Sequence, residues 1–206
     1  MRSTRILAVI VAVSLLSIGA FAANPDEEKT VANLQAAYNG ESNAHARYLE
    51  FAKKADIEGY GEVASAFRAA ANAEEVHANN HAEVLKKMGA TPTAKIETPD
   101  VKSTKENLEA AIKGETYERD VMYPEFIKQA KAVRNTAALR TFNLAKTAEA
   151  EHAKIYTANL TDLPKLKGTK SKQYFVCSVC GFTVTNIDFS KCPSCFEPKE
   201  KYNAVS

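Results

Sequence analysis

The chain has 206 residues, of which 45% are hydrophobic and 25% are charged, and its formal net charge is +2. This length allows one substantial domain and a small one, and the composition is ordinary for a soluble globular protein. The small net charge, without a long basic run, gives no sign of a nucleic-acid partner.

Residues 1–22 predict a secretory signal peptide. Arg2 and Arg5 precede an apolar run over 6–18, and Ala20-Phe21-Ala22 supplies the small residues of a cleavage site after Ala22. The run is shorter than the roughly 20 residues that span a membrane. We therefore expect export to the periplasm and no stable membrane anchor; an uncleaved anchor helix is the alternative.

The first two predicted helices form a hairpin. Asn24 caps a helix that has Pro25 at its first position and continues to about Ile57. After a turn around Gly59, an Ala-rich helix covers about 62–88 and ends before Gly89, which is typical of a helix C-terminus.

A long connection leads to the third and fourth predicted helices. Residues 91–103 contain two prolines and no apolar periodicity. Ser103 and Glu106 form a capping-box pattern that opens a helix to about Val133, and Asn135 caps a helix that ends near Pro164. Four long helices with one long central connection predict a ferritin-like four-helix bundle over 23–164. The alternative, two separate helical hairpins, leaves the acidic residues of each hairpin facing nothing.

Two stretches of the chain repeat each other. Residues 33–41 recur 74 positions later at 107–115, each ending in Gly-Glu, and Phe67, Glu74 and His77 recur 75 positions later. A hydrophobic core accounts for repeated leucines and alanines. It does not account for a repeated Glu and a repeated Glu-x-x-His, which are costly to bury unless a metal ion is their partner.

The repeated polar residues match the ligand set of a two-metal site. Residues three apart share a helix face, so each Glu-x-x-His pair points one way. One Glu from each of two helices and a Glu-x-x-His from each of the other two are the ligands of di-iron carboxylate bundles. A solvated helix face explains one such motif, but not two at matching offsets. The predicted ligands are Glu41, Glu74, His77, Glu115, Glu149 and His152.

A small four-cysteine domain is predicted at 173–206, after a basic linker at 165–172. Its two Cys-x-x-Cys pairs suit a tetrahedral iron or zinc ion. Two disulfides, or a structural zinc ribbon, are the alternatives. Gly181, Pro193 and nearby aromatic residues make the segment similar to rubredoxin, which favours iron, whereas Phe196 stands where free-standing rubredoxins usually have Gly. The four predicted ligands are Cys177, Cys180, Cys192 and Cys195.

From Asn33 to about Tyr202 the chain resembles the rubrerythrin family. The most specific match is Gly114-Glu-Thr-Tyr-Glu118, followed by Met122-Tyr-Pro124. Glu118 corresponds to an additional carboxylate of that family, and its counterpart in the first repeat is Ala44.

The resemblance implies specific roles for the ligands. One iron exchanges His77 for Glu118 on oxidation, because a ferric ion favours an anionic ligand. Glu41 completes that iron's site, while Glu115 and His152 hold the other iron. In this scheme, the bridging ligands are Glu74 and Glu149. Tyr48 and Tyr123 would donate hydrogen bonds to ligating carboxylates; ordinary core tyrosines are the alternative. The catalytic residues implied are Glu118, His77, Tyr48 and Tyr123.

The resemblance also implies a peroxidase. Hydrogen peroxide is reduced to water at a di-iron centre, and a tetrathiolate iron relays the electrons in a homodimer whose cysteine domain serves the partner's bundle. Export points to a periplasmic redox protein as the donor. The alternatives are a ferroxidase that detoxifies ferrous iron, and a non-catalytic electron carrier or zinc-binding module. We expect His45 at an exposed helix position, with a hydrogen bond to a metal ligand as the alternative. His81 is either a satisfied buried residue or one that alters the polarity of the site, and neither histidine is a predicted ligand.

Overall fold

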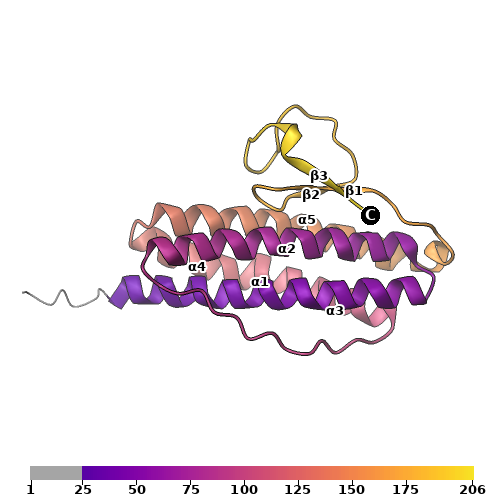
Figure 1. The fold of residues 1–206 in the computed structure, drawn as a ribbon, viewed down its shortest axis with the longest axis horizontal. Coiled ribbons are helices and arrows are strands. Elements are labelled where there is room, and N and C mark those ends of the chain that lie inside the picture. Colours follow the sequence, from indigo (N-terminus) through magenta and orange to yellow (C-terminus); the bar gives the residue numbers. More distant parts are fainter. Residues whose placement is uncertain (1–24) are drawn as a thin grey trace, which may run out of the picture.

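The structure, a computed structural model, describes residues 25–206; the predicted signal peptide lies outside them. It is a long helical bundle with a small β domain on one side (Figure 1). The helices are α1 (Pro25–Ile57), α2 (Gly61–Lys87), α3 (Thr104–Tyr117), α4 (Tyr123–Ala132) and α5 (Thr136–Leu166). A π-helical segment, η1 (Glu118–Met122), joins α3 to α4. The predicted four-helix bundle is confirmed, with α3, η1 and α4 together forming the third helix.

The helix ends agree with their local sequence. The Ser103 side chain accepts a hydrogen bond from the backbone N–H of Glu106, and the Glu106 side chain accepts one from the backbone N–H of Ser103. The Asn135 side chain accepts from the backbone of Ala138 at 2.9 Å. Gly89 has a φ of +77°, a conformation that favours glycine just beyond a helix. The end of α5 lies slightly beyond the predicted position, because this helix continues through Pro164 to Leu166.

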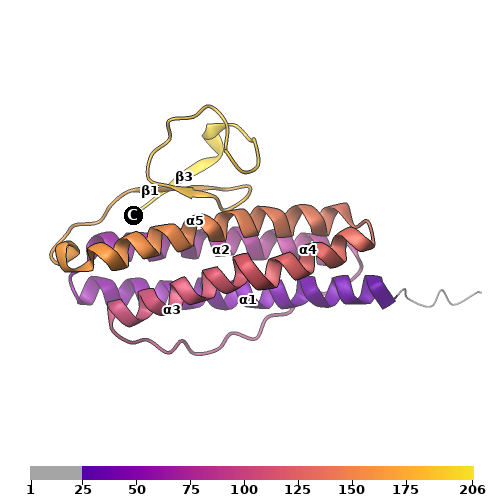
Figure 2. The ribbon, with the colours of Figure 1, turned by 180° about the vertical axis from the view of Figure 1, so that it is seen from behind.

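The crossover 88–103 runs along α1, on the face away from the small domain (Figures 1 and 2). A stripe of amides at 35, 39 and 43 holds alternate residues of the crossover: Asn39 accepts from the backbone of Lys95 and Asn43 from that of Glu97, each at 2.8 Å. Four helical residues rise about 6 Å and two extended residues about 6.6 Å, so the two spacings match. This stripe fixes the path of the long connection.

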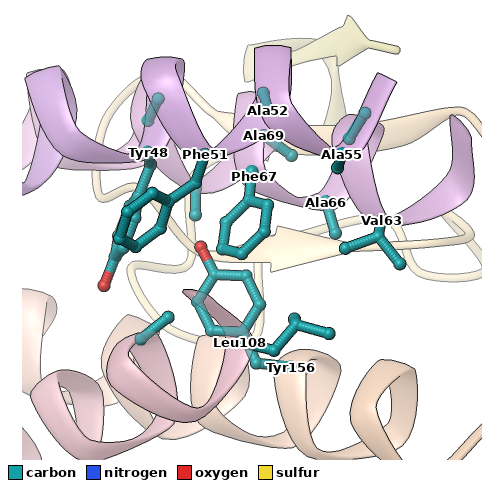
Figure 3. Close-up of a cluster of buried hydrophobic side chains, with 14 of the residues drawn as sticks. Tyr48, Phe51, Ala52, Ala55, Val63, Ala66, Phe67, Ala69, Leu108 and Tyr156 are labelled. Carbon is teal, nitrogen blue, oxygen red and sulfur yellow. The ribbon is translucent and has the colours of Figure 1, made fainter. Parts of the chain in front are cut away.

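Two apolar clusters divide the bundle core. One surrounds Tyr48, Phe67 and Tyr156 (Figure 3), and the other surrounds Tyr123 and Phe142. On each long helix the predicted metal ligands fall between residues of the two clusters. The polar site is therefore enclosed in the middle of an otherwise apolar core.

The small domain carries a three-stranded antiparallel sheet in the order β2-β1-β3, formed by β1 (Tyr174–Cys177), β2 (Thr183–Val184) and β3 (Tyr202–Val205). A 3-10 turn, η2 (Lys199–Lys201), precedes β3. Tyr174 and Val176 pack into the first apolar cluster of the bundle. The linker passes close to Gly61, where an added Cβ would meet the Thr169 carbonyl at 2.5 Å. Within residues 25–206 we find no helix with the length and hydrophobicity to cross a membrane.

Candidate metal centres

Six predicted ligands meet, fully buried, in the middle of the bundle. Their facing atoms form two overlapping groups, each within 4.8 Å. One group is Glu41, Glu74, His77 and Glu149, and the other is Glu74, Glu115, Glu149 and His152. Glu74 and Glu149 are members of both groups, which is the position expected of carboxylates that bridge two metal ions. Each remaining member faces only one group.

This cluster leaves many polar atoms without a well-aligned hydrogen bond, although histidine nitrogens and carboxylate oxygens approach one another closely. The atoms without such a bond are Glu41 Oε2, Glu74 Oε1, Glu115 Oε2, both Glu149 carboxylate oxygens and His152 Nδ1. Buried polar atoms are normally hydrogen-bonded, so this many orphans in one place require another partner. Hard carboxylate oxygens together with imidazole nitrogens suit iron. The residues present thus fit a di-iron centre.

The electrostatics of the cluster lead to the same conclusion. Burial, followed by the charges of Glu74 and Glu149, raises the pKa of Glu41 well above its usual range. Burial and the charge of Glu74 raise the pKa of Glu115 to about 8. Burial also tends to raise the pKa of Glu74, but hydrogen bonds and charge from His152 and His77 outweigh this effect and lower the pKa to about 2. Without bound cations, ionising all of these carboxylates at once would be energetically unfavourable.

Each histidine turns one nitrogen to the cluster and the other to the small domain. His77 Nδ1 lies 2.8 Å from Glu74 and 3.0 Å from Glu149, and its Nε2 lies 3.1 Å from the Cys180 carbonyl. His152 Nδ1 lies 2.9 Å from Glu149, and its Nε2 lies 3.1 Å from the Thr183 hydroxyl. A metal-binding histidine commonly donates its second N–H in this way, which fixes the tautomer.

Tyr48 and Tyr123 donate hydrogen bonds to carboxylates of the cluster, as the resemblance implied, and each bond joins one repeat to the other. Tyr48, from the first repeat, donates to Glu115 of the second. Tyr123, from the second repeat, donates to Glu41 of the first. Each phenol therefore orients a carboxylate that belongs to only one of the two ligand groups.

Glu118 stands at the start of η1, outside both ligand groups; the residue as a whole is partly exposed, but its carboxyl group is buried. Burial raises the pKa of its carboxyl well above the usual range, and Glu41 contributes most among the neighbouring charges. The π segment was not predicted from the sequence. The signal was present: the repeat offset changes from 74 at Glu115 to 75 at Tyr123, and a π turn accommodates one additional residue.

The remaining bundle histidines are both held by hydrogen bonds. His81 is fully buried, as expected, with Nε2 3.1 Å from the Tyr123 hydroxyl and Nδ1 3.0 Å from that of Thr141. Burial, with the nearby charge of His77, lowers the pKa of His81 to about 3, so it is neutral. The expectation for His45 was wrong: it is half-buried and its Nδ1 bonds the Ala71 carbonyl at 2.7 Å, joining α1 to α2.

The four cysteines are free thiols gathered around one point rather than two disulfides. Cys177 and Cys195 have sulfurs 3.7 Å apart, and those of Cys180 and Cys192 are 3.6 Å apart. Four sulfurs about 2.3 Å from one ion would stand about 3.8 Å from each other, so the cluster fits a tetrahedral metal. The Tyr202 hydroxyl donates to the Cys192 sulfur at 3.1 Å.

The small domain sits directly on its own chain's carboxylate cluster. Gly181 makes this approach possible: its φ is +74°, and a Cβ there would lie 2.2 Å from His77 Nε2. The Asn80 amide also donates to the Val179 carbonyl at 3.0 Å. The resemblance implied that this domain serves a partner subunit; here the contact is made within one chain.

Comparison with known proteins gives consistent matches. The rubrerythrin family model matches residues 32–160. Nigerythrin of Nitratidesulfovibrio vulgaris is 38% identical over 85% of this chain and 86% of its own, and rubrerythrin-2 of Clostridium acetobutylicum is 35% identical over 83% and 94%. A solved structure of fully reduced, all-ferrous nigerythrin has a TM-score of 0.78, at 32% identity, covering 98% of this chain and 100% of that one.

Proposed function

Because this chain belongs to the rubrerythrin family, we propose that it reduces hydrogen peroxide to water at a di-iron site fed with electrons by iron at the four cysteines. The observation that carries the proposal is the contact between the two centres. The backbone carbonyl of Cys180, a predicted thiolate ligand, lies 3.1 Å from the ring of His77, a predicted di-iron ligand. A ligand-to-ligand contact of this kind suits electron transfer and serves no purpose in a storage site.

Two bound ferrous ions would supply the two electrons that peroxide reduction consumes. The residues of this chain prepare the site for that reaction. Hydrogen bonds from Tyr48 and Tyr123 orient Glu115 and Glu41, and the apolar clusters exclude bulk water. Glu118 is the adjacent carboxylate able to enter the site when the metal charge rises.

The small domain would restore the electrons one at a time. The Tyr202 hydrogen bond to Cys192 favours the reduced state's extra negative charge on sulfur, and so contributes to the potential. Cys195 is the only one of the four cysteines that is not fully buried, so electrons would enter at this side of the cluster.

We also propose that the mature protein works in the periplasm with a small periplasmic redox protein as donor. This rests on the signal-peptide pattern of residues 1–22, since nicotinamide cofactors are cytoplasmic. Cell fractionation with N-terminal sequencing tests it: an N-terminus at Ala23 in the periplasmic fraction is expected, and an uncut cytoplasmic protein would end this part of the proposal.

Turnover and metal content test the enzymatic proposal. We expect three irons per chain, a thiolate-to-iron charge-transfer spectrum, and consumption of peroxide much faster than oxygen. Colourless protein with zinc at the cysteines would eliminate the electron relay. Anaerobic reduction followed by peroxide, with the spectra of both centres recorded, identifies which centre is oxidised first.

Mixing two inactive variants tests whether electrons pass within one chain. One variant lacks the cysteine site through Cys177→Ser and Cys192→Ser, and the other lacks a di-iron ligand through Glu149→Ala. The geometry predicts that mixed subunits regain no peroxidase activity, because each chain serves its own bundle. Recovery of activity in the mixture would show delivery between subunits of a homodimer, as the family resemblance implied.

A second candidate is oxidation of ferrous iron. The bundle resembles that of Desulfovibrio desulfuricans bacterioferritin, whose structure concerns its di-iron site in different catalytic states, with a TM-score of 0.66 at 26% identity over 73% of this chain. Rapid, oxygen-driven turnover of added ferrous iron, with slow use of peroxide, would favour this function over the peroxidase.

A further inference from the structure

A hydrogen-bonded chain leads to the edge of the metal site at Glu41. The Tyr123 hydroxyl has one proton and donates it to Glu41, so its oxygen accepts from His81 Nε2. A neutral histidine with a proton on Nε2 accepts at Nδ1, so the hydroxyl of Thr141 is the donor there. Every bond in the chain therefore points toward Glu41.

The outer end of this chain reaches a surface pocket. Thr141 is 5% exposed and lines a pocket of about 520 Å³ between α2 and α5. Asn80, Arg140 and Val179 line the same pocket, so it lies beside the small domain. By contrast, His81 and Tyr123 are fully buried. The chain thus connects solvent with an interior that bulk water does not enter.

The first half of the repeat has no such chain. Moving by 75 positions replaces Tyr123 with Tyr48, His81 with Tyr156 and Thr141 with Ala66. Tyr48 still donates to Glu115, but the Tyr156 hydroxyl has no partner and Ala66 is apolar and buried (Figure 3). A repeated scaffold thus carries a complete polar path in one half and an interrupted one in the other.

We propose that Thr141, His81 and Tyr123 relay a proton from the pocket to hydrogen peroxide at the Glu41 side of the metal site. This rests on the proposed function, in which hydrogen peroxide, two electrons and two protons give two water molecules. It adds a proton route to that reaction. The route ends beside Glu41, because the Tyr123 hydroxyl donates to this carboxylate and Glu41 is a member of the metal-ligand group.

Each passage is a concerted exchange of bonds. The Thr141 proton forms an N–H bond at Nδ1 of His81 while the Nε2 proton moves to the Tyr123 oxygen and the Tyr123 proton moves to an oxygen of hydrogen peroxide. Water in the pocket replaces the proton of Thr141. This route supplies one of the two protons that the reaction consumes and leaves His81 with its proton on Nδ1; no relay residue changes its net charge.

Four variants test the relay in single-turnover oxidation of the reduced holoenzyme by hydrogen peroxide. His81→Phe and Thr141→Val should each slow oxidation at least about tenfold and raise the solvent deuterium isotope effect, as expected when proton transfer becomes limiting. Thr141→Ser retains the hydroxyl and should react as the wild type does. Tyr156→Phe, at the equivalent position in the other half, is the matched control and should be unchanged.

A second measurement does not depend on turnover. In protein loaded with redox-inert zinc, nitrogen NMR should show the His81 proton on Nε2, and Thr141→Val should leave that assignment intact while shifting Nδ1. A proton on Nδ1 in the wild type would overturn the relay, as would full-speed oxidation in Thr141→Val with both metal sites filled. If the wild type consumes no peroxide, the proposed function fails while the tautomer still tests the hydrogen-bond order.

Discussion

The two halves of the metal site share their ligands but differ in what surrounds them. At the Glu41 half, His77 contacts a cysteine carbonyl, and the pKa of the Glu118 carboxyl is raised by burial and then, among the neighbouring charges, chiefly by Glu41. At the Glu115 half, the contact of His152 with the small domain is to a threonine hydroxyl, and the adjoining phenol leads to no polar path. A duplicated scaffold provides two metal positions, and the unrepeated residues would concentrate the proposed redox and proton chemistry at one of them.

The largest expected effect comes from disturbing the contact between the small domain and His77. Gly181→Ala places a methyl group against His77 and disfavours the backbone conformation there, so the domain must shift. A misplacement of about 1 Å can cost about a hundredfold in rate, and we expect a loss of that order in electron transfer from the cysteine iron. Stopped-flow reduction of the di-iron centre measures it.

Thr183→Val is the matched change at the other half, because it removes the hydroxyl that meets His152. We expect the rate of electron transfer to fall by less than about tenfold, at or below the lower end of the effects typical of residues that orient metal ligands. Equal losses in the two variants would contradict the claim that electrons enter through the His77 half.

Glu118→Ala removes the carboxylate that has no counterpart in the first repeat. We expect the protein to keep both irons of the bundle and to turn over peroxide about tenfold more slowly, with iron analysis and steady-state assays as the measurements. Ala44→Glu would not create a mirror-image site, because Ala44 is 1% exposed and a carboxylate there would be buried without a partner. Unchanged turnover in Glu118→Ala would remove the ligand-exchange role.

A change in pH distinguishes the empty site from the filled one. The pKa values of Glu41 and Glu115 are raised on folding, so their protonation stabilises the folded metal-free protein as pH falls from above about 8. His77 and His152 also have raised pKa values, and their contribution is complete below about 6.5. Melting of metal-free protein should therefore occur several degrees higher at pH 6 than at pH 8.5, since about 1 kcal/mol corresponds to about 2–4 °C.

The iron-loaded protein should show the reverse trend, because metal ligands must lose their protons. Glu115→Gln in the metal-free protein is the control and should flatten the pH dependence. A metal-free protein that is more stable at pH 8.5 than at pH 6 would contradict the proposed repulsion among the buried carboxylates.

The smallest expected effect is at Tyr202. Its hydroxyl donates to the Cys192 sulfur, and losing a hydrogen bond of about 1 kcal/mol corresponds to about 40 mV for one electron. Tyr202→Phe should lower the potential of the cysteine iron by about that amount. Redox titration measures the shift, and an unchanged potential would show that this bond does not tune the site.

Much of the bundle could be predicted because its signals are local. The Ser103 capping box, the Asn135 cap and Gly89 mark helix ends by chemistry within a few residues, and the structure shows all three. The ligand sets were predictable for a related reason: spacing along a helix places Glu74 and His77 on one face. The repeat then showed that the same pair occurs twice.

The rest depends on contacts that leave little trace in local sequence. A π turn breaks the spacing on which helix interpretation depends, and only the changed repeat offset at Tyr123 signals it. The contact of His77 with Cys180 uses a backbone carbonyl, which every residue possesses. His45 looked exposed because its partner, the Ala71 carbonyl, comes from another helix.

The hydrogen bonds from His77 and His152 to the small domain link two processes that occur at different places. Docking holds each ring with its Nδ1 facing the cluster, which is the arrangement that metals require. By thermodynamic reciprocity, metal loading must strengthen docking by the same factor by which docking strengthens loading. The connection at 167–173 should accordingly be cut by protease faster in the metal-free protein, so that incompletely loaded chains are the ones removed.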